Sequence, residues 1–209
     1  MGHVVLLGDS ILDNAAYVRG GPDVVRQLRG KLPAGWDASL LARDGAVTRE
    51  VRGQLAGLPK DATHLVVSAG GNDALGASFL LGQRVGTVAE AVSLLENAQS
   101  HFASDYAEMA EAVAATGLPA AFCTVYDTPS SAPDHRIVRT ALAVFNDVIT
   151  RAAFARGAGL IDLRLICDEP DDYANPIEPS AKGGDKIAAV IAQVVVGNTI
   201  FPRSQVFAH

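Results

Sequence analysis

Residues 4–10 have the sequence Val4-Val5-Leu6-Leu7-Gly8-Asp9-Ser10, an apolar run that stops at a glycine, an aspartate and a serine. Uninterrupted aliphatic runs of this length are typical of strands buried on both faces of a parallel sheet. Gly8 permits a sharp turn, so we expect Asp9 and Ser10 just past the strand, at the edge where open α/β sheets bind ligands. The same two residues are also common helix caps, so this stretch alone leaves a structural role open beside a nucleophilic one.

Length and composition indicate a single globular domain. The chain has 209 residues, of which 49% are hydrophobic and 19% are charged, so it can form a sizeable core. The formal net charge of −6 and the lack of a Lys/Arg cluster argue against a nucleic-acid or anionic membrane partner. We expect one domain over residues 1–197 and a C-terminal surface extension over residues 198–209.

The termini, cysteines and histidines add further expectations. Residues 1–3 lead directly into the first strand without a visible secretion signal, and no apolar stretch has the length of a membrane span. Cys123 lies in an apolar run and is expected to be a buried free thiol, far in sequence from Cys167. The five histidines show no metal-ligand spacing. We therefore expect a cytoplasmic protein without metal or cofactor, and the sequence leaves its oligomeric state open.

Strands and helices are predicted to alternate along the chain. Further strands are expected at residues 37–42, 64–69, 120–125 and 159–163, with helices at 23–32, 48–55, 87–115, 135–156 and 180–196. This alternation predicts an α/β protein in which a five-stranded parallel sheet carries helices on both faces, a three-layer sandwich.

Two more loops follow strands at the same edge of the predicted sheet. Gly45 follows the second strand, and Gly70-Gly71-Asn72-Asp73 follows the third. With Ser10, these loops offer the groups that acyl transfer needs: a hydroxyl to attack a carbonyl, and the Ser10 N–H, the Gly45 N–H and the Asn72 side-chain amide to stabilise the oxyanion. Taken singly, a turn glycine and an Asn-Asp turn explain the last two loops equally well.

The order Gly-Asp-Ser, loop glycine, Gly-Gly-Asn-Asp resembles the SGNH/GDSL hydrolase family over most of the chain, from residue 3 to about residue 196. Asn146 and residues 161–163 resemble structural positions of the same family. The resemblance implies a flavodoxin-like α/β/α sandwich and activity on a small-molecule ester. It further implies that Ser10 is the nucleophile and that Gly45 and Asn72 are oxyanion donors.

The fourth block of the family departs from the pattern in this chain. The family places Asp-x-x-His before the last helix, with the histidine as general base and the aspartate orienting it. Here the matching residues are Asn175 and Glu178, followed by the family-like Gly183 and Lys186. The usual histidine base is absent.

Three hypotheses follow from this departure. In the first, Glu178 is the base; its ordinary pKa is about 2 units below that of histidine, burial would reduce the deficit, and a neutral Asn175 avoids carboxylate repulsion. In the second, His135 is the base, oriented by Asp171 or Asp172. In the third, the protein binds an acyl or carbonyl ligand without hydrolysing it, and a scaffold role stands as a further alternative. The first hypothesis predicts an ester hydrolase of modest rate.

Other polar residues are weaker candidates. Asp9, Asp73 and His135 are expected to contribute to substrate binding. Residues 13–14 and Arg43 either line the pocket or lie in exposed loops. The acidic run at residues 168–172 is expected to be a solvated loop, because no histidine accompanies it as a metal ligand would.

Overall fold

A parallel sheet of five strands forms the centre of the computed structural model, which describes residues 1–197. The extension expected at residues 198–209 lies outside the described residues. The strands are β1 (Gly2–Gly8), β2 (Trp36–Leu40), β3 (His64–Ser68), β4 (Ala120–Cys123) and β5 (Gly159–Ile161). Their order across the sheet is β2-β1-β3-β4-β5, and every neighbouring pair is parallel. This is the order of a flavodoxin-like sheet, so the predicted fold class is confirmed.

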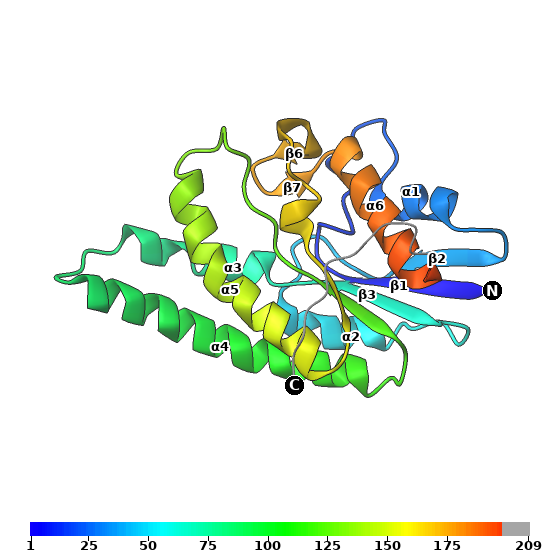
Figure 1. Cartoon of the computed structure of the whole chain (residues 1–209), viewed down its shortest axis with the longest axis horizontal. Coiled ribbons are helices and arrows are strands. Elements are labelled where there is room, and N and C mark those ends of the chain that lie inside the picture. Colours follow the sequence, from blue (N-terminus) through cyan, green and yellow to red (C-terminus); the bar gives the residue numbers. More distant parts are fainter. Residues whose placement is uncertain (198–209) are drawn as a thin grey trace.

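Helices cover both faces of the sheet. The main helices are α1 (Val24–Lys31), α2 (Val51–Leu55), α4 (Val88–Ala114), α5 (His135–Ala155) and α6 (Ala181–Val196). One core contains α1 and α6, and the other contains α2, α4 and α5. Figure 1 shows α1 and α6 above the sheet and α2 and α4 below it. Among residues 1–197, no helix combines the length and the apolar character that a membrane span needs.

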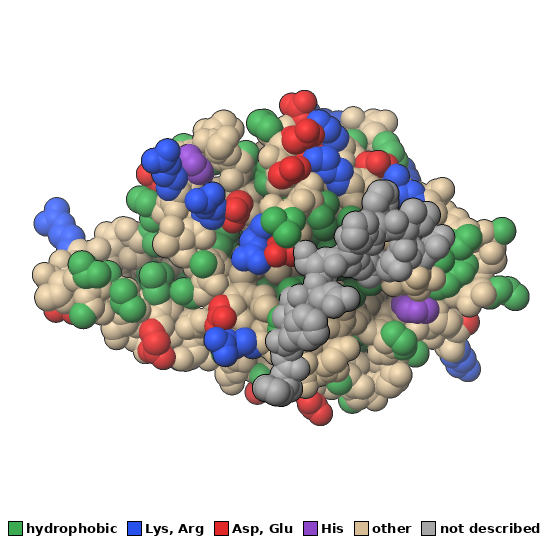
Figure 2. Space-filling view, viewed as in Figure 1, with side chains coloured by type: hydrophobic (Ala, Val, Ile, Leu, Met, Phe, Trp, Pro, Cys, Tyr) green, Lys and Arg blue, Asp and Glu red, His purple; other side chains and the backbone are tan. Residues whose placement is uncertain are grey.

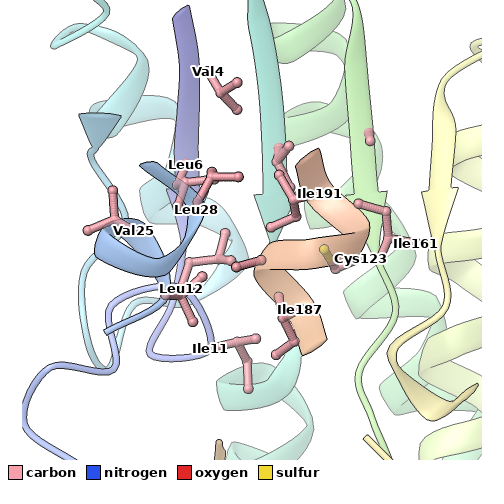
Figure 3. Packing of buried hydrophobic residues seen from close by; sticks show 14 of the residues in the cluster. Val4, Leu6, Ile11, Leu12, Val25, Leu28, Cys123, Ile161, Ile187 and Ile191 are labelled. Carbon is pink, nitrogen blue, oxygen red and sulfur yellow. The ribbon is translucent and has the colours of Figure 1, made fainter. Parts of the chain in front are cut away.

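The alternation of side chains along β1 explains why this strand is the centre of the sheet. Val4 and Leu6 belong to the core under α1 and α6, whereas Val5 and Leu7 belong to the opposite core, and all four are fully buried. Figure 3 shows Val4 and Leu6 on the same side as Ile191 of α6. A strand with helices on both faces has no polar side, and its sequence is therefore aliphatic at every position.

Two short elements were not expected from the sequence. Residues 71–82, for which no helix or strand was predicted, form helix α3 (Gly71–Gly76) and the 3₁₀ helix η2 (Ser78–Gly82). Residues 173–179 form an antiparallel pair of strands, β6 (Tyr173–Asn175) and β7 (Glu178–Pro179), separate from the main sheet. Both segments are too short for a periodic pattern, and tertiary contacts decide their structure. The remaining short elements are η1 (Thr48–Glu50), η3 (Leu163–Leu165) and η4 (Pro170–Asp172).

The strand order places a crevice at the carboxyl ends of β1 and β3. The chain leaves β1 to form β2 on one side and later returns to form β3 on the other side of β1. Loops at such a switch point diverge, and the space between them is where open α/β sheets bind ligands. Ser10 follows β1 and Asn72 follows β3, so both residues lie at this crevice.

Candidate active site

The turn that carries Ser10 requires a glycine. Gly8 has a φ of +119°, and a Cβ atom there would lie 1.6 Å from the carbonyl oxygen of Ser68. The buried side-chain amide of Gln54 fixes the peptide groups of Gly8: its Oε1 accepts from the Gly8 N–H at 2.7 Å, and its Nε2 donates to the Gly8 carbonyl at 2.8 Å. Gln54 therefore holds both the N–H and the carbonyl of Gly8, two residues before the serine. Sequence reasoning missed Gln54, which lies in α2 without any motif to mark it.

Ser10 and Glu178 meet at the crevice. The Ser10 hydroxyl donates a hydrogen bond to Oε1 of Glu178 at 3.0 Å, across 168 positions of sequence. Both residues are buried, with exposed fractions of 6% and 4%. Among the described residues, the second carboxylate oxygen of Glu178 has no hydrogen-bond partner. The glutamate at the family's histidine position thus points to the serine and not to solvent.

Burial raises the pKa of Glu178 to about 7. The hydrogen bond from Ser10 opposes this rise because it stabilises the carboxylate, and the negative charge of Asp44 adds to it. Histidine has an ordinary pKa of about 6.5, so the burial of Glu178 offsets the deficit in basicity that an exposed glutamate would have.

Of the three oxyanion candidates, Ser10 and Gly45 lie on the loops predicted for them, and Asn72 lies in the first turn of α3. The backbone N–H groups of Ser10 and Gly45 have no acceptor within the described part of the chain. Gly45 is exposed and has a φ of +79°, which favours glycine, but it does not line the cavity described below. Asn72 lines that cavity, and its Nδ2 donates to the carbonyl oxygen of Ala46 at 2.9 Å, leaving one N–H of the amide for a ligand.

Three other candidates have different surroundings. Asp73 accepts hydrogen bonds from the N–H and hydroxyl of Thr48, so its carboxylate ties α3 to the loop after β2. Asn175 lies opposite Glu178 in the β6–β7 pair, and its Oδ1 accepts from the N–H of Ile177. His135 begins α5 and does not line the cavity, and no described hydrogen bond joins it to Ser10. The structure therefore brings Glu178, and neither His135 nor Asn175, to the serine.

Asp9 is a buried carboxyl group beside the nucleophile. Its Oδ1 accepts from the N–H of Ile11 and from the hydroxyl of Ser68, at 3.2 and 3.3 Å. Burial raises the pKa of Asp9 to about 7, and these hydrogen bonds only partly oppose the shift. Asp9 lines the cavity, as expected for a substrate-binding role, but its carboxylate form is destabilised in the folded protein.

We expect Asp9→Asn to stabilise the protein at high pH. Because folding raises the pKa of Asp9, the folded state binds this proton more tightly than the unfolded state, and stability falls as pH rises from about 4 to 7. Asparagine keeps the Oδ1 acceptor without the charge. At pH 8.5 the free energy of unfolding of Asp9→Asn should exceed that of the wild type by up to about 4 kcal/mol. This limit is the rise in the pKa of Asp9 on folding multiplied by about 1.36 kcal/mol per pKa unit. Urea denaturation at pH 4.5 and 8.5 measures the difference.

The difference between the two proteins should be much smaller at pH 4.5, where Asp9 is neutral in the folded state. Asp147→Asn provides the control, because Asp147 lies exposed on α5 and pairs with Arg151; we expect a change within about 0.5 kcal/mol at either pH. A wild type that is more stable than Asp9→Asn at pH 8.5 would show that the Asp9 carboxylate is favoured in the fold.

A cavity of about 280 Å³ opens beside Ser10 and Glu178. It continues away from the sheet, between α3–η2 and the N-terminal halves of α4 and α5. Its apolar lining comes from α3 and η2 (Leu75, Leu80, Leu81), from α4 (Leu95, Ala98) and from α5 (Val138, Ala141, Leu142, Phe145). Ser10, Asn72 and Glu178 belong to its polar lining, together with Asp9, Ser68, Ser78 and Thr128. A ligand with a polar reacting centre and an apolar chain matches this lining.

The end of the molecule beyond the cavity also carries exposed hydrophobic side chains. The N-terminal half of α4 extends past the sheet together with η2 (Figure 1). Phe79, Val88 and Val92 are exposed there, and Figure 2 shows hydrophobic side chains gathered at this end. An apolar molecule approaching the cavity from this side therefore meets an apolar surface.

Two residues expected in exposed loops are buried, although residues 168–171 of the acidic run are exposed as expected. Asn14 is fully buried: its Oδ1 accepts from the N–H of Val24, and its Nδ2 donates to the carbonyl of Pro179 at 3.4 Å. Asp172, in the acidic run, is also fully buried and accepts from Nζ of Lys186 at 2.8 Å. Both side chains replace water with partners from segments distant in sequence, which local composition does not reveal. In residues 1–197, no cluster of His, Cys, Asp and Glu is arranged to hold a metal ion.

A buried serine at the end of the first strand, hydrogen-bonded to a carboxylate and open to an apolar cavity, is the arrangement expected of a serine hydrolase built on an α/β/α sandwich. The chain belongs to the GDSL-like lipase/acylhydrolase family, whose family model matches residues 6–186.

Solved structures share this fold at low sequence identity. An extracellular lipase from Streptomyces rimosus is 16% identical, with a TM-score of 0.69 over 93% of this chain and 99% of the lipase. A phospholipase A1 from Streptomyces albidoflavus is 15% identical, with a TM-score of 0.66 over 92% and 98%. LAE5, a hydrolase from the metagenome of Lake Arreo, is 20% identical, with a TM-score of 0.68 over 95% and 97%. No curated protein matches the chain.

Proposed function

We propose that the protein hydrolyses carboxylic esters with Ser10 as nucleophile and Glu178 as general base. The observation that carries this proposal is the 3.0 Å hydrogen bond from the Ser10 hydroxyl to the buried carboxylate of Glu178. A nucleophile and a base within hydrogen-bond reach are the first geometric requirement for nucleophilic catalysis. A pKa of about 7 supports the second requirement, a base that accepts a proton near neutral pH.

The reaction proceeds in two halves. Glu178 takes the Ser10 proton as Oγ attacks the ester carbonyl, and the negative charge passes from the carboxylate to the tetrahedral oxyanion. The Ser10 and Gly45 N–H groups and the Asn72 amide are the proposed donors to that oxyanion. Collapse expels the alcohol, which takes the proton from Glu178 and leaves an acyl-serine. Water, deprotonated by Glu178, then attacks the acyl-serine, and Ser10 recovers its proton as the carboxylic acid leaves.

The cavity supports an ester with an apolar acyl chain. In the acyl-serine, the acyl group is joined to Ser10, from which the apolar lining extends between α4 and α5. Three structural neighbours are titled lipase, phospholipase A1 and acetyl xylan esterase. The apolar lining of this chain favours a long apolar acyl group over an acetyl group.

The alternative is a protein that binds an acyl or carbonyl ligand without turnover. This alternative follows from the missing Asp-His pair, and a Glu178 side chain that faced solvent would support it. The buried contact between Glu178 and Ser10 favours hydrolysis instead. A ligand that stabilises the wild type against unfolding but is recovered unchanged would support the alternative.

A series of 4-nitrophenyl esters tests the proposed function. We expect Ser10-dependent hydrolysis of the acetyl ester, and kcat/KM should rise about fourfold per added CH₂ while the chain stays within the cavity, since burying a CH₂ group stabilises by about 0.8 kcal/mol. Ala141→Phe should remove this rise beyond short chains, because the new ring would occupy the cavity. Ala143→Phe is the matched control: Ala143 lies on the same helix but is exposed and does not line the cavity. No turnover above the blank with any ester would refute the proposal.

A further inference from the structure

Within residues 1–197, Ser10 is the only side chain that forms a hydrogen bond with Glu178, the residue that we propose as the base. In the family pattern an aspartate holds the histidine, but Asn175, at the aspartate position, bonds the N–H of Ile177 instead. Oε1 of Glu178 accepts from Ser10, and Oε2 has no described partner. Glu178 lies in a two-residue strand outside the main sheet, so the sheet itself does not fix its position either.

The backbone of the residues on either side of Glu178 is held by side chains from the main sheet's loops. The hydroxyl of Tyr126, which follows β4, donates to the carbonyl of Ile177 at 3.0 Å. The Nδ2 of Asn14, which follows β1, donates to the carbonyl of Pro179 at 3.4 Å. Residues 177 and 179 are the immediate neighbours of Glu178, so the two contacts bracket it. The loop that carries Asn14 also carries the nucleophile.

We infer that Tyr126 is the positioning residue for Glu178, with Asn14 in a supporting role, and that this backbone clamp does the work of the missing orienting aspartate. This inference rests on the proposed function of Glu178. The contact from Tyr126 is the shorter of the two, and Tyr126 is 4% exposed, so little water competes for its hydroxyl. Asn14 also holds the N–H of Val24 at the start of α1.

The surroundings of Tyr126 keep the hydroxyl protonated and the ring fixed. Burial holds the pKa of Tyr126 well above its usual value, so the group donates at any working pH. Its ring meets that of Tyr173 edge to face, with the ring centroids 5.2 Å apart. The Tyr173 hydroxyl in turn donates to the carbonyls of Asp127 and Cys167. Phenylalanine at position 126 would keep the ring contact and lose only the hydrogen bond.

The test compares Tyr126→Phe with Tyr106→Phe in the full chain. Tyr106, a residue of α4, is fully buried, and its hydroxyl has no hydrogen-bond partner in the described structure, so Tyr106→Phe makes the same chemical change away from the clamp. We expect Tyr126→Phe to lower kcat for a 4-nitrophenyl ester about two- to tenfold, the range of one hydrogen bond, with KM changed less than twofold. Tyr106→Phe should change neither constant.

The pKa of Glu178 provides a second measurement, because a loss of stability alone would not change it. The carboxyl carbon of ¹³C-labelled Glu178 is assigned by its disappearance in Glu178→Gln and followed by NMR against pH. Because the Ser10 hydrogen bond lowers the pKa of Glu178, a carboxylate that drifts from Ser10 should titrate at higher pH in Tyr126→Phe. The titratable neighbours Asp9 and Asp44 are unchanged in this variant, and so is Tyr17, whose hydroxyl donates a hydrogen bond to Asp44.

The outcomes separate the clamp from the catalytic proposal. Equal kcat and equal Glu178 titration in the two tyrosine variants would overturn the clamp, and so would equal losses in both. If the protein hydrolyses no ester but Tyr126→Phe raises the pKa of Glu178, the clamp stands and the proposed function fails. If Glu178→Gln stays active and Tyr126→Phe leaves the titration unchanged, both fail.

Discussion

Ser10→Ala is expected to lower kcat/KM for a 4-nitrophenyl ester by on the order of 10⁴- to 10⁶-fold, the range that removal of a serine nucleophile gives. The alanine lacks the Oγ that forms the acyl-serine, so no covalent intermediate can accumulate. Oxyanion stabilisation and binding would persist and leave a small rate above that of water. Initial rates over a range of substrate concentrations measure the loss of turnover. Labelling by a fluorophosphonate probe, read by mass spectrometry, measures the loss of the nucleophile.

The control for this prediction is another serine of the same cavity. Ser78 lines the cavity at the start of η2, and no described hydrogen bond joins it to Glu178. We expect Ser78→Ala to keep kcat/KM within a few fold and to keep fluorophosphonate labelling at Ser10. Labelling of Ser10→Ala at the wild-type rate, or undiminished turnover, would assign the nucleophile to another residue.

Glu178→Gln is expected to lower kcat/KM at pH 8 by about 10²- to 10⁴-fold, the usual contribution of a general base. Glutamine has the same shape and can still accept the Ser10 hydrogen bond, but it does not take up the proton. In the wild type, kcat/KM should rise with pH through a midpoint near 7, because the pKa of Glu178 is raised to about 7 and only the carboxylate is a base. A pH series of kcat/KM from 5 to 9 for both proteins measures the rate and the midpoint.

His135→Ala separates the two hypotheses for the base. His135 begins α5 without lining the cavity, so its removal should leave both the rate and the midpoint within twofold of the wild type. A large loss in His135→Ala together with an active Glu178→Gln would transfer the role of base to the histidine.

Glu178 departs from the family pattern, and its burial explains how a glutamate can take the place of the histidine. An exposed glutamate is about 2 pKa units less basic than histidine and would be a poor substitute at neutral pH. Burial raises its pKa to about 7, although the hydrogen bond from Ser10 lowers it. The surrounding fold, and not the residue type, therefore gives Glu178 its basicity.

The sequence by itself determined the sheet. The aliphatic run at residues 4–7 is buried on both faces, and the predicted strands appear in the predicted places, with bounds that differ by one or two residues. These predictions succeeded because a parallel strand between two helical layers has no polar side, and such a pattern is visible locally. The order Gly8-Asp9-Ser10, Gly45, Asn72 likewise predicted which loops lie at the carboxyl edge, because chain direction alone places them there.

Only the tertiary structure decided how the site is assembled. The Ser10–Glu178 contact spans 168 positions. Gln54 and Tyr126 hold its two sides from two further segments, and Asn14 does so from the loop that carries Ser10. None of these side chains has a local signal, because a hydrogen bond between distant segments leaves no periodicity in either one. The pKa of Glu178 is decided in the same way, since desolvation depends on every segment that covers the carboxylate and on none of them alone.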